Sequence, residues 1–107
     1  MACILLIDDD CQIVTALSQA LRHMGFEVQT ACDGDEGIEL IDSGYQYDLV
    51  ITDIAKHIRE SNRPDIPIVA ITGFDDSAID RELFNSLLMK PFSLDALFHV
   101  VRLFLRD

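Results

Sequence analysis

Two short runs of consecutive apolar residues, Cys3–Ile7 and Leu49–Ile51, constrain the fold of this chain most. Neither run alternates with polar residues, and such runs are typical of strands that are buried on both faces of a parallel sheet. Parallel strands need long crossover connections, which place helices on the faces of the sheet. The two runs therefore predict an α/β domain.

The segments between and after these runs alternate between strand and helix patterns. Apolar residues recur at helical spacing from Ile13 to Met24, and Gly25 is a plausible stop. Asp33 and Glu36 have the spacing of a capping box, and Ser93 is placed to cap the last helix. Further strands are expected at 26–31, 66–71 and 87–89, and further helices between 33 and 44, at 55–62, at 76–84 and from 94 to the end. Five strands alternating with helices predict a doubly wound parallel sheet with right-handed crossovers.

Length and charge narrow the class of protein. A chain of 107 residues predicts one domain, 1–107, without room for a second core. The net charge of −11 argues against binding to nucleic acid or to an acidic membrane. No apolar run is long enough to span a bilayer, and no signal-peptide pattern opens the chain, so a cytoplasmic location is expected.

The cysteines, Cys3, Cys11 and Cys32, are odd in number and contain no C-x-x-C pair. We therefore expect small buried or half-buried thiols in a reducing compartment, not a disulfide framework or a zinc site. Cys11 directly follows a cluster of acids, so it is either a redox thiol or a partly buried structural cysteine, and the structural interpretation is favoured.

Polar side chains stand where the expected strands end: Asp8, Asp9 and Asp10 after the first, Asp53 after the third, Thr72 after the fourth and Lys90 after the fifth. If the first strand lies between the second and third, with the fourth and fifth beyond, these residues converge on one crevice. Clustered carboxylates repel one another, and a hard cation such as Mg²⁺ would relieve the repulsion. A carboxylate nucleophile with Mg²⁺, a lysine and a hydroxyl suits phosphoryl transfer onto the carboxylate.

Four segments carry a resemblance to a known family: Ile4–Asp10, Asp48–Asp53, Ile68–Gly73 and Met89–Phe92. Together they resemble the receiver domain of two-component response regulators, in the chemotaxis-type single-domain form. The resemblance implies a flavodoxin-like fold, with a five-stranded parallel sheet in the order 2-1-3-4-5.

The resemblance also implies roles for individual residues. Asp53 matches the phospho-acceptor, Asp9 the direct metal ligand and Asp8 the acid that holds the metal through water. The metal implied is Mg²⁺, with the carbonyl of Ala55 as a further ligand.

Thr72 and Lys90 match the residues that contact the phosphoryl group. The implied partner is a histidine kinase or a histidine phosphotransfer protein, and the domain is expected to accept a phosphoryl group and to assist its own dephosphorylation, not to act as an enzyme.

The chain also departs from the family pattern. Eighteen residues separate Asp53 from Thr72 and seventeen separate Thr72 from Lys90, which is fewer than the family usually has. The third and fourth helices are therefore expected to be short, with the first shortening in segment 54–65. Leu87 stands where the family usually has an aromatic residue. Apolar residues fill a wide arc of the last helix, which suggests a homodimer or partner contact there.

Two alternatives stay open. A receiver-like dimerisation or interaction domain would keep the fold without productive phosphorylation. A phosphatase of the aspartyl-phosphate type is weaker, because Ala55 stands where such enzymes usually carry a second acid. His23, His57 and His99 are expected to be surface or helix-face residues and not metal ligands, because none has a partner at metal-ligand spacing.

Overall fold

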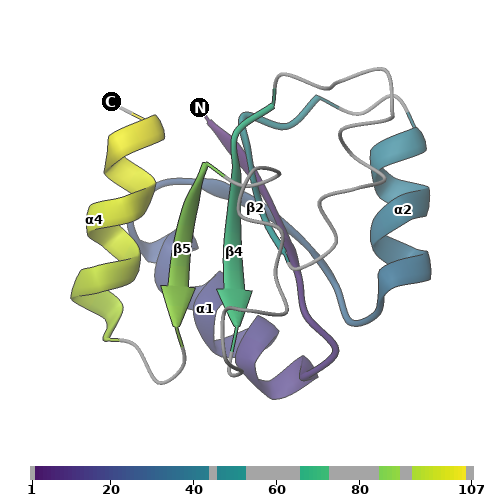
Figure 1. The fold of residues 1–107 in the computed structure, drawn as a ribbon, viewed down its shortest axis with the longest axis horizontal. Helices are drawn as coiled ribbons and strands as arrows, with labels where there is room; N and C mark the ends of the chain where they lie inside the picture. The colour runs from purple at the N-terminus through teal and green to yellow at the C-terminus, as the bar shows by residue number, and fades with distance from the viewer. Residues whose placement is uncertain (1, 44–45, 53–65, 73–84, 90–92, 106–107) are drawn as a thin grey trace.

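The chain forms a five-stranded parallel sheet with helices on both faces (Figure 1). The computed structural model describes residues 2–43, 46–52, 66–72, 85–89 and 93–105, apart from a few side chains. The strands are β1 (Cys3–Ile7), β2 (Glu27–Ala31), β3 (Leu49–Ile51), β4 (Ile68–Thr72) and β5 (Ser86–Met89), and the helices are α1 (Cys11–His23), α2 (Gly34–Asp42) and α4 (Leu94–Phe104). Their order across the sheet is β2-β1-β3-β4-β5, which confirms the predicted fold class and strand order.

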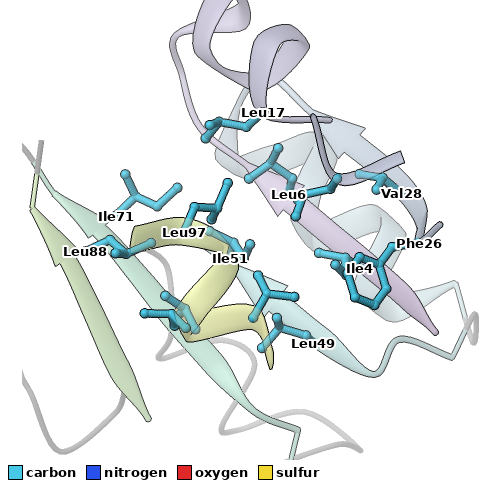
Figure 2. Close-up of a cluster of buried hydrophobic side chains, with 14 of the residues drawn as sticks. Ile4, Leu6, Leu17, Phe26, Val28, Leu49, Ile51, Ile71, Leu88 and Leu97 are labelled. Atoms are coloured by element: carbon cyan, nitrogen blue, oxygen red, sulfur yellow. The ribbon is translucent and has the colours of Figure 1, made fainter. Parts of the chain in front are cut away.

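The core lies in two layers, one on each face of the sheet. The larger layer joins α1 and α4 to the sheet, and it contains Ile4, Leu6, Val14, Leu17, Leu21, Phe26, Val28, Leu49, Ile51, Val69, Ile71, Leu88, Leu97, Val100, Val101 and Leu105. Figure 2 shows side chains of this layer converging between α1, α4 and the strands. The smaller layer lies on the side of α2 and contains Cys3, Leu5, Ile7, Ala31, Ile41, Tyr47, Val50 and Ile68.

Strand β1 shows why its sequence is apolar throughout. Ile4 and Leu6 pack into the larger layer, while Leu5 and Ile7 pack into the smaller one. Every residue of β1 is buried, because the strand lies between β2 and β3 and under helices on both faces. Its neighbour β2 is an edge strand, which agrees with the alternating polar residues of its sequence.

Local sequence signals set the ends of the helices. The side chain of Asp33 accepts a hydrogen bond from the backbone N–H of Glu36 (2.7 Å), and that of Ser93 accepts one from Ala96 (3.1 Å). Gly25 follows α1 with φ of 98°, a left-handed conformation that L side chains rarely adopt. The predicted caps are confirmed, although α4 ends at Phe104 and does not continue to the last residue.

The fourth strand begins two residues later than predicted. Pro67 lies outside β4, and its carbonyl oxygen accepts a hydrogen bond from Val50 (3.0 Å). The N–H of Ile68 donates to the side chain of Asn85 (2.9 Å), and Ile68 is the first residue of β4 that pairs with β3, opposite Val50. A proline has no N–H to contribute, which explains why the strand excludes it.

Most of the apolar arc of α4 belongs to the core. Leu97, Val100 and Val101 are buried, and Phe98 and Phe104 pack partly against the larger layer. Of the large apolar residues that the structure describes, those left exposed are Leu94 (49%) and Leu103 (54%). The arc is therefore mainly a packing surface, and the predicted interface on this helix would have to be built on two leucines.

Two predicted helices, at 55–62 and 76–84, lie outside the described residues, and so does the proposed shortening. Within the described part of the chain, no helix is both long enough and apolar enough to cross a bilayer.

Candidate functional site at the carboxyl edge of the sheet

An acidic turn connects β1 to α1 at the carboxyl edge of the sheet. Asp8 directly follows β1, and its backbone N–H donates to the carbonyl oxygen of Ala31 (3.2 Å), at the end of the neighbouring β2. The Oδ1 atom of Asp8 accepts a hydrogen bond from the N–H of Asp10 (3.0 Å), which closes the turn. Asp8 is only 8% exposed, whereas Asp9 is exposed at the tip. The turn is thus attached to the sheet at Asp8 and presents Asp9 to solvent.

Asp10 has a structural task in this turn. Its Oδ1 atom accepts hydrogen bonds from the N–H groups of Gln12 (3.0 Å) and Ile13 (3.3 Å), and so it caps α1. The carboxylate of Asp10 is thus engaged with the backbone at the start of α1.

The sheet register brings the end of β3 beside the acidic turn. Leu6 of β1 lies opposite Ile51 of β3, two residues before Asp8 in the chain. Thr52, which follows Ile51, is fully buried, and its N–H donates to the carbonyl oxygen of Val69 (2.9 Å). The chain is therefore held firmly into the sheet up to the residue before Asp53.

The other predicted site residues are only partly described. Thr72 is the last residue of β4, opposite Met89 of β5, so its backbone lies at the same edge of the sheet. Asp53, Ala55 and Lys90 lie outside the described residues, as does the side chain of Thr72. The structure thus places Asp8 and Asp9 at the predicted edge.

The donors in the acidic turn have the chemistry that Mg²⁺ requires. Asp8 and Asp9 offer carboxylate oxygens, and Mg²⁺ binds through one or two carboxylates together with water and phosphate oxygens. Among the described residues, no three acidic, histidine or cysteine side chains gather closely enough to hold a metal. A complete site therefore needs oxygen donors beyond this turn, such as those predicted from Asp53 and Ala55.

The cysteines contradict the prediction of free thiols. Cys11, the first residue of α1, forms a disulfide with Cys32, which directly follows β2, and their Cα atoms are 5.2 Å apart. Cys11 is exposed, not buried or half-buried as predicted, while Cys3 is a buried cysteine that takes no part in this disulfide. The prediction failed because the two residues are 21 positions apart and meet only through the pairing of β1 with β2. Their positions just beyond two neighbouring strands were the available signal.

The chain matches the family model of the response regulator receiver domain over residues 4–102. Among curated relatives, it is 32% identical to the transcription factor SKN7 of Saccharomyces cerevisiae over 97% of this chain and 19% of that protein. It is 29% identical to the transcriptional regulatory protein CrdR of Helicobacter pylori, over 97% of this chain and 55% of that protein. The chain thus spans about half of CrdR and much less of SKN7. The SKN7 alignment takes 120 positions, so this chain of 107 residues is the shorter over the matched span.

Solved structures share the fold along its whole length. The response regulator TrrA of Thermotoga maritima, solved in complex with Mg²⁺ and BeF, has a TM-score of 0.87 and 31% identity, covering 98% of this chain and all of that one. A two-component response regulator of Clostridium difficile has a TM-score of 0.83 and 26% identity, covering 100% of this chain and 98% of that one. Receiver domains of this kind are signalling modules and not classical enzymes. With the β2-β1-β3-β4-β5 sheet, the acidic turn after β1 and a family match over nearly the whole chain, this protein belongs to the response regulator receiver domain family.

Proposed function

We propose that this chain, acting as a single receiver domain, is a phospho-acceptor module of a two-component phosphorelay in the cytoplasm. A phosphohistidine on a histidine kinase or a phosphotransfer protein donates its phosphoryl group to Asp53. The observation that carries the proposal is the acidic turn of Asp8 and Asp9, fixed at the end of the central strand β1 beside the strand that leads to Asp53. Output passes through protein contacts.

In the transfer step, a carboxylate oxygen of Asp53 forms the new bond to phosphorus while the bond from phosphorus to the histidine nitrogen breaks. Asp8 and Asp9, with Asp53 and the Ala55 carbonyl, would hold Mg²⁺. When bound, this ion neutralises negative charge on the phosphoryl and carboxylate oxygens.

The protein residues orient the reaction. The hydrogen bond from Asp8 to Ala31 and the cap of Asp10 fix the position of the turn before any ligand arrives. Lys90 supplies a positive charge and Thr72 a hydroxyl donor for the phosphoryl oxygens, as their positions in the family pattern imply. The same pocket, with water in place of the histidine, would support self-dephosphorylation.

Phosphorylation with a small donor tests the proposal. The chain is incubated with acetyl phosphate and Mg²⁺, and its intact mass is recorded over time. We expect a gain of one phosphoryl group in the unmodified chain, none in Asp53→Asn, and a strongly reduced rate in Asp9→Asn. Asp10→Ser is the matched control, because it removes a neighbouring carboxylate but keeps an oxygen acceptor for the helix cap. Absence of any mass gain at high donor concentration would rule the proposal out.

A second candidate is a receiver-like dimerisation or interaction domain that is not productively phosphorylated. Leu94 and Leu103 are exposed on α4, and because they are nine residues apart they lie on opposite sides of the helix, so each offers a separate apolar contact. Sedimentation of the chain and of Leu94→Ser/Leu103→Ser would test it. A dimer that the double substitution dissociates, together with no phosphoryl gain, would favour this second function.

A further inference from the structure

The disulfide joins Cys11, the first residue of α1, to Cys32, the residue that follows β2. Because β1 pairs with β2, this bond lies beside the acidic turn that follows β1. We propose that this pair is a reversible thiol–disulfide switch that sets the Mg²⁺ affinity of the acidic turn. The dependence on Mg²⁺ rests on the proposed function, whereas the reversibility of the disulfide is measured independently of it.

The exposure of the pair makes it accessible to thiol exchange. Cys11 is exposed and Cys32 is half-buried, so an attacking thiolate can reach a sulfur atom from solvent. Cys3, at 5% exposure, is the contrasting structural thiol in the smaller core layer. In the cytoplasm, where the proposed function places this domain, disulfides are usually transient and catalytic or redox-sensing.

The position of the disulfide couples it to the acidic turn. The turn is attached to the end of β2 twice: at Asp8 through the hydrogen bond to Ala31, and at Cys11 through the disulfide to Cys32. Asp9 and Asp10, both exposed, lie between these two attachments. Reduction removes the second attachment and leaves the hydrogen bond and the cap of Asp10. The reduced turn must then lose more conformational freedom when it binds a cation.

The redox step is a thiol–disulfide exchange with a small disulfide such as oxidised glutathione. The two cysteine thiols together lose two electrons and two protons as their S–S bond forms. The glutathione disulfide takes up the same two electrons and two protons and yields two molecules of reduced glutathione. The reverse reaction opens the protein disulfide.

A glutathione titration tests the reversibility. The chain is equilibrated at different ratios of reduced to oxidised glutathione, and acid then stops the exchange and unfolds the chain. The thiols are alkylated with N-ethylmaleimide, and the intact mass is measured by mass spectrometry. We expect a single transition between one and three alkylated thiols, governed by the square of the reduced glutathione concentration over the oxidised concentration. Cys11→Ser/Cys32→Ser should lack the transition, and Cys3→Ala should keep it with one thiol fewer. A pair that stays bonded in reduced glutathione alone, or that never bonds in oxidised glutathione, would overturn the proposal.

Calorimetric titration of the oxidised and the reduced chain with Mg²⁺ tests whether the disulfide changes the Mg²⁺ affinity. We expect the oxidised chain to bind Mg²⁺ roughly three- to tenfold more tightly, the factor that corresponds to ordering one more side chain. Cys11→Ser/Cys32→Ser should show the weaker affinity under both conditions. Equal affinities in the two states would refute the coupling. If the oxidised chain binds Mg²⁺ more tightly as expected but Asp53 gains no phosphoryl group, the proposed function is refuted and the redox switch is not.

Discussion

The helix cap at Asp10 permits a test that separates structural stability from metal binding in one turn. In Asp10→Ala, the N–H groups of Gln12 and Ile13 lose the acceptor that lies 3.0 and 3.3 Å away. Loss of an N-cap of this kind costs about 1 kcal/mol, within a range of roughly 0.5–2 kcal/mol. The helix that loses its cap contributes Val14, Leu17 and Leu21 to the larger core layer, so the loss should reach the global stability.

The expected change in melting temperature follows from the chain length. Unfolding entropy near 60 °C is about 2.1 cal/mol/K per residue, so 1 kcal/mol lowers the melting temperature of a chain of 107 residues by roughly 4–5 °C. The measurement is thermal unfolding by circular dichroism under reducing conditions, because the disulfide at Cys11 would otherwise hold the first turn of α1. Urea unfolding should give the same loss with an unchanged m-value.

Asp10→Ser is the matched variant, because serine is also a good N-cap but has no charge. We expect its stability to stay within about 0.5 kcal/mol of the unmodified chain. Removing one exposed charge about 6 Å from a doubly charged cation in water changes the energy by about 1.4 kcal/mol, so the Mg²⁺ affinity should fall by at most about tenfold, and by less when salt screens the charges. Asp9→Asn should lose most of the Mg²⁺ binding. If Asp10→Ser destabilises the chain as much as Asp10→Ala, the capping argument is wrong.

Two further substitutions test the packing of the sheet. An added Cβ at Gly37 would lie 2.5 Å from Cδ1 of Ile7, so Gly37→Ala should destabilise the chain, because overpacking of roughly 1–3 kcal/mol outweighs a helix-propensity gain of about 1 kcal/mol. In urea unfolding, adding Ile7→Val to Gly37→Ala should recover part of the lost stability. If the two substitutions change the free energy of unfolding independently, the clash is contradicted. Tyr47→Phe removes the hydrogen bond that the tyrosine hydroxyl donates to Oε1 of Gln29 (2.7 Å) and should lower the free energy of unfolding by roughly 0.5–1.5 kcal/mol in the same measurement. An unchanged free energy of unfolding would show that this bond does not stabilise the fold.

Local patterns in the sequence predicted the elements well where burial follows a regular period. The uninterrupted apolar run of β1 indicated a strand buried on both faces, and the structure divides Leu5 and Leu6 between the two core layers. The caps at Asp33 and Ser93 were also predictable, because a cap bonds to an N–H only three residues away. The end of β4 at Thr72 and the acidic turn at Asp8 lie at the carboxyl edge, as the predicted strand order required.

Tertiary structure decided the features that depend on residues far apart in the chain. The width of the apolar arc on α4 could not show that Phe98 and Phe104 pack against the core, which leaves Leu94 and Leu103 as the exposed part. The predicted roles of Asp53, Thr72, Lys90 and Ala55 rest on the family pattern and stay predictions.

The cysteines show the difference most directly. An odd count without a C-x-x-C pair argued for free thiols, yet Cys11 and Cys32 are bonded across 21 positions. Sequence spacing encodes which face of a helix or strand is buried, because that depends on a local period. The distance between two remote side chains is set only when β1 and β2 pair and their ends are brought to one edge of the sheet.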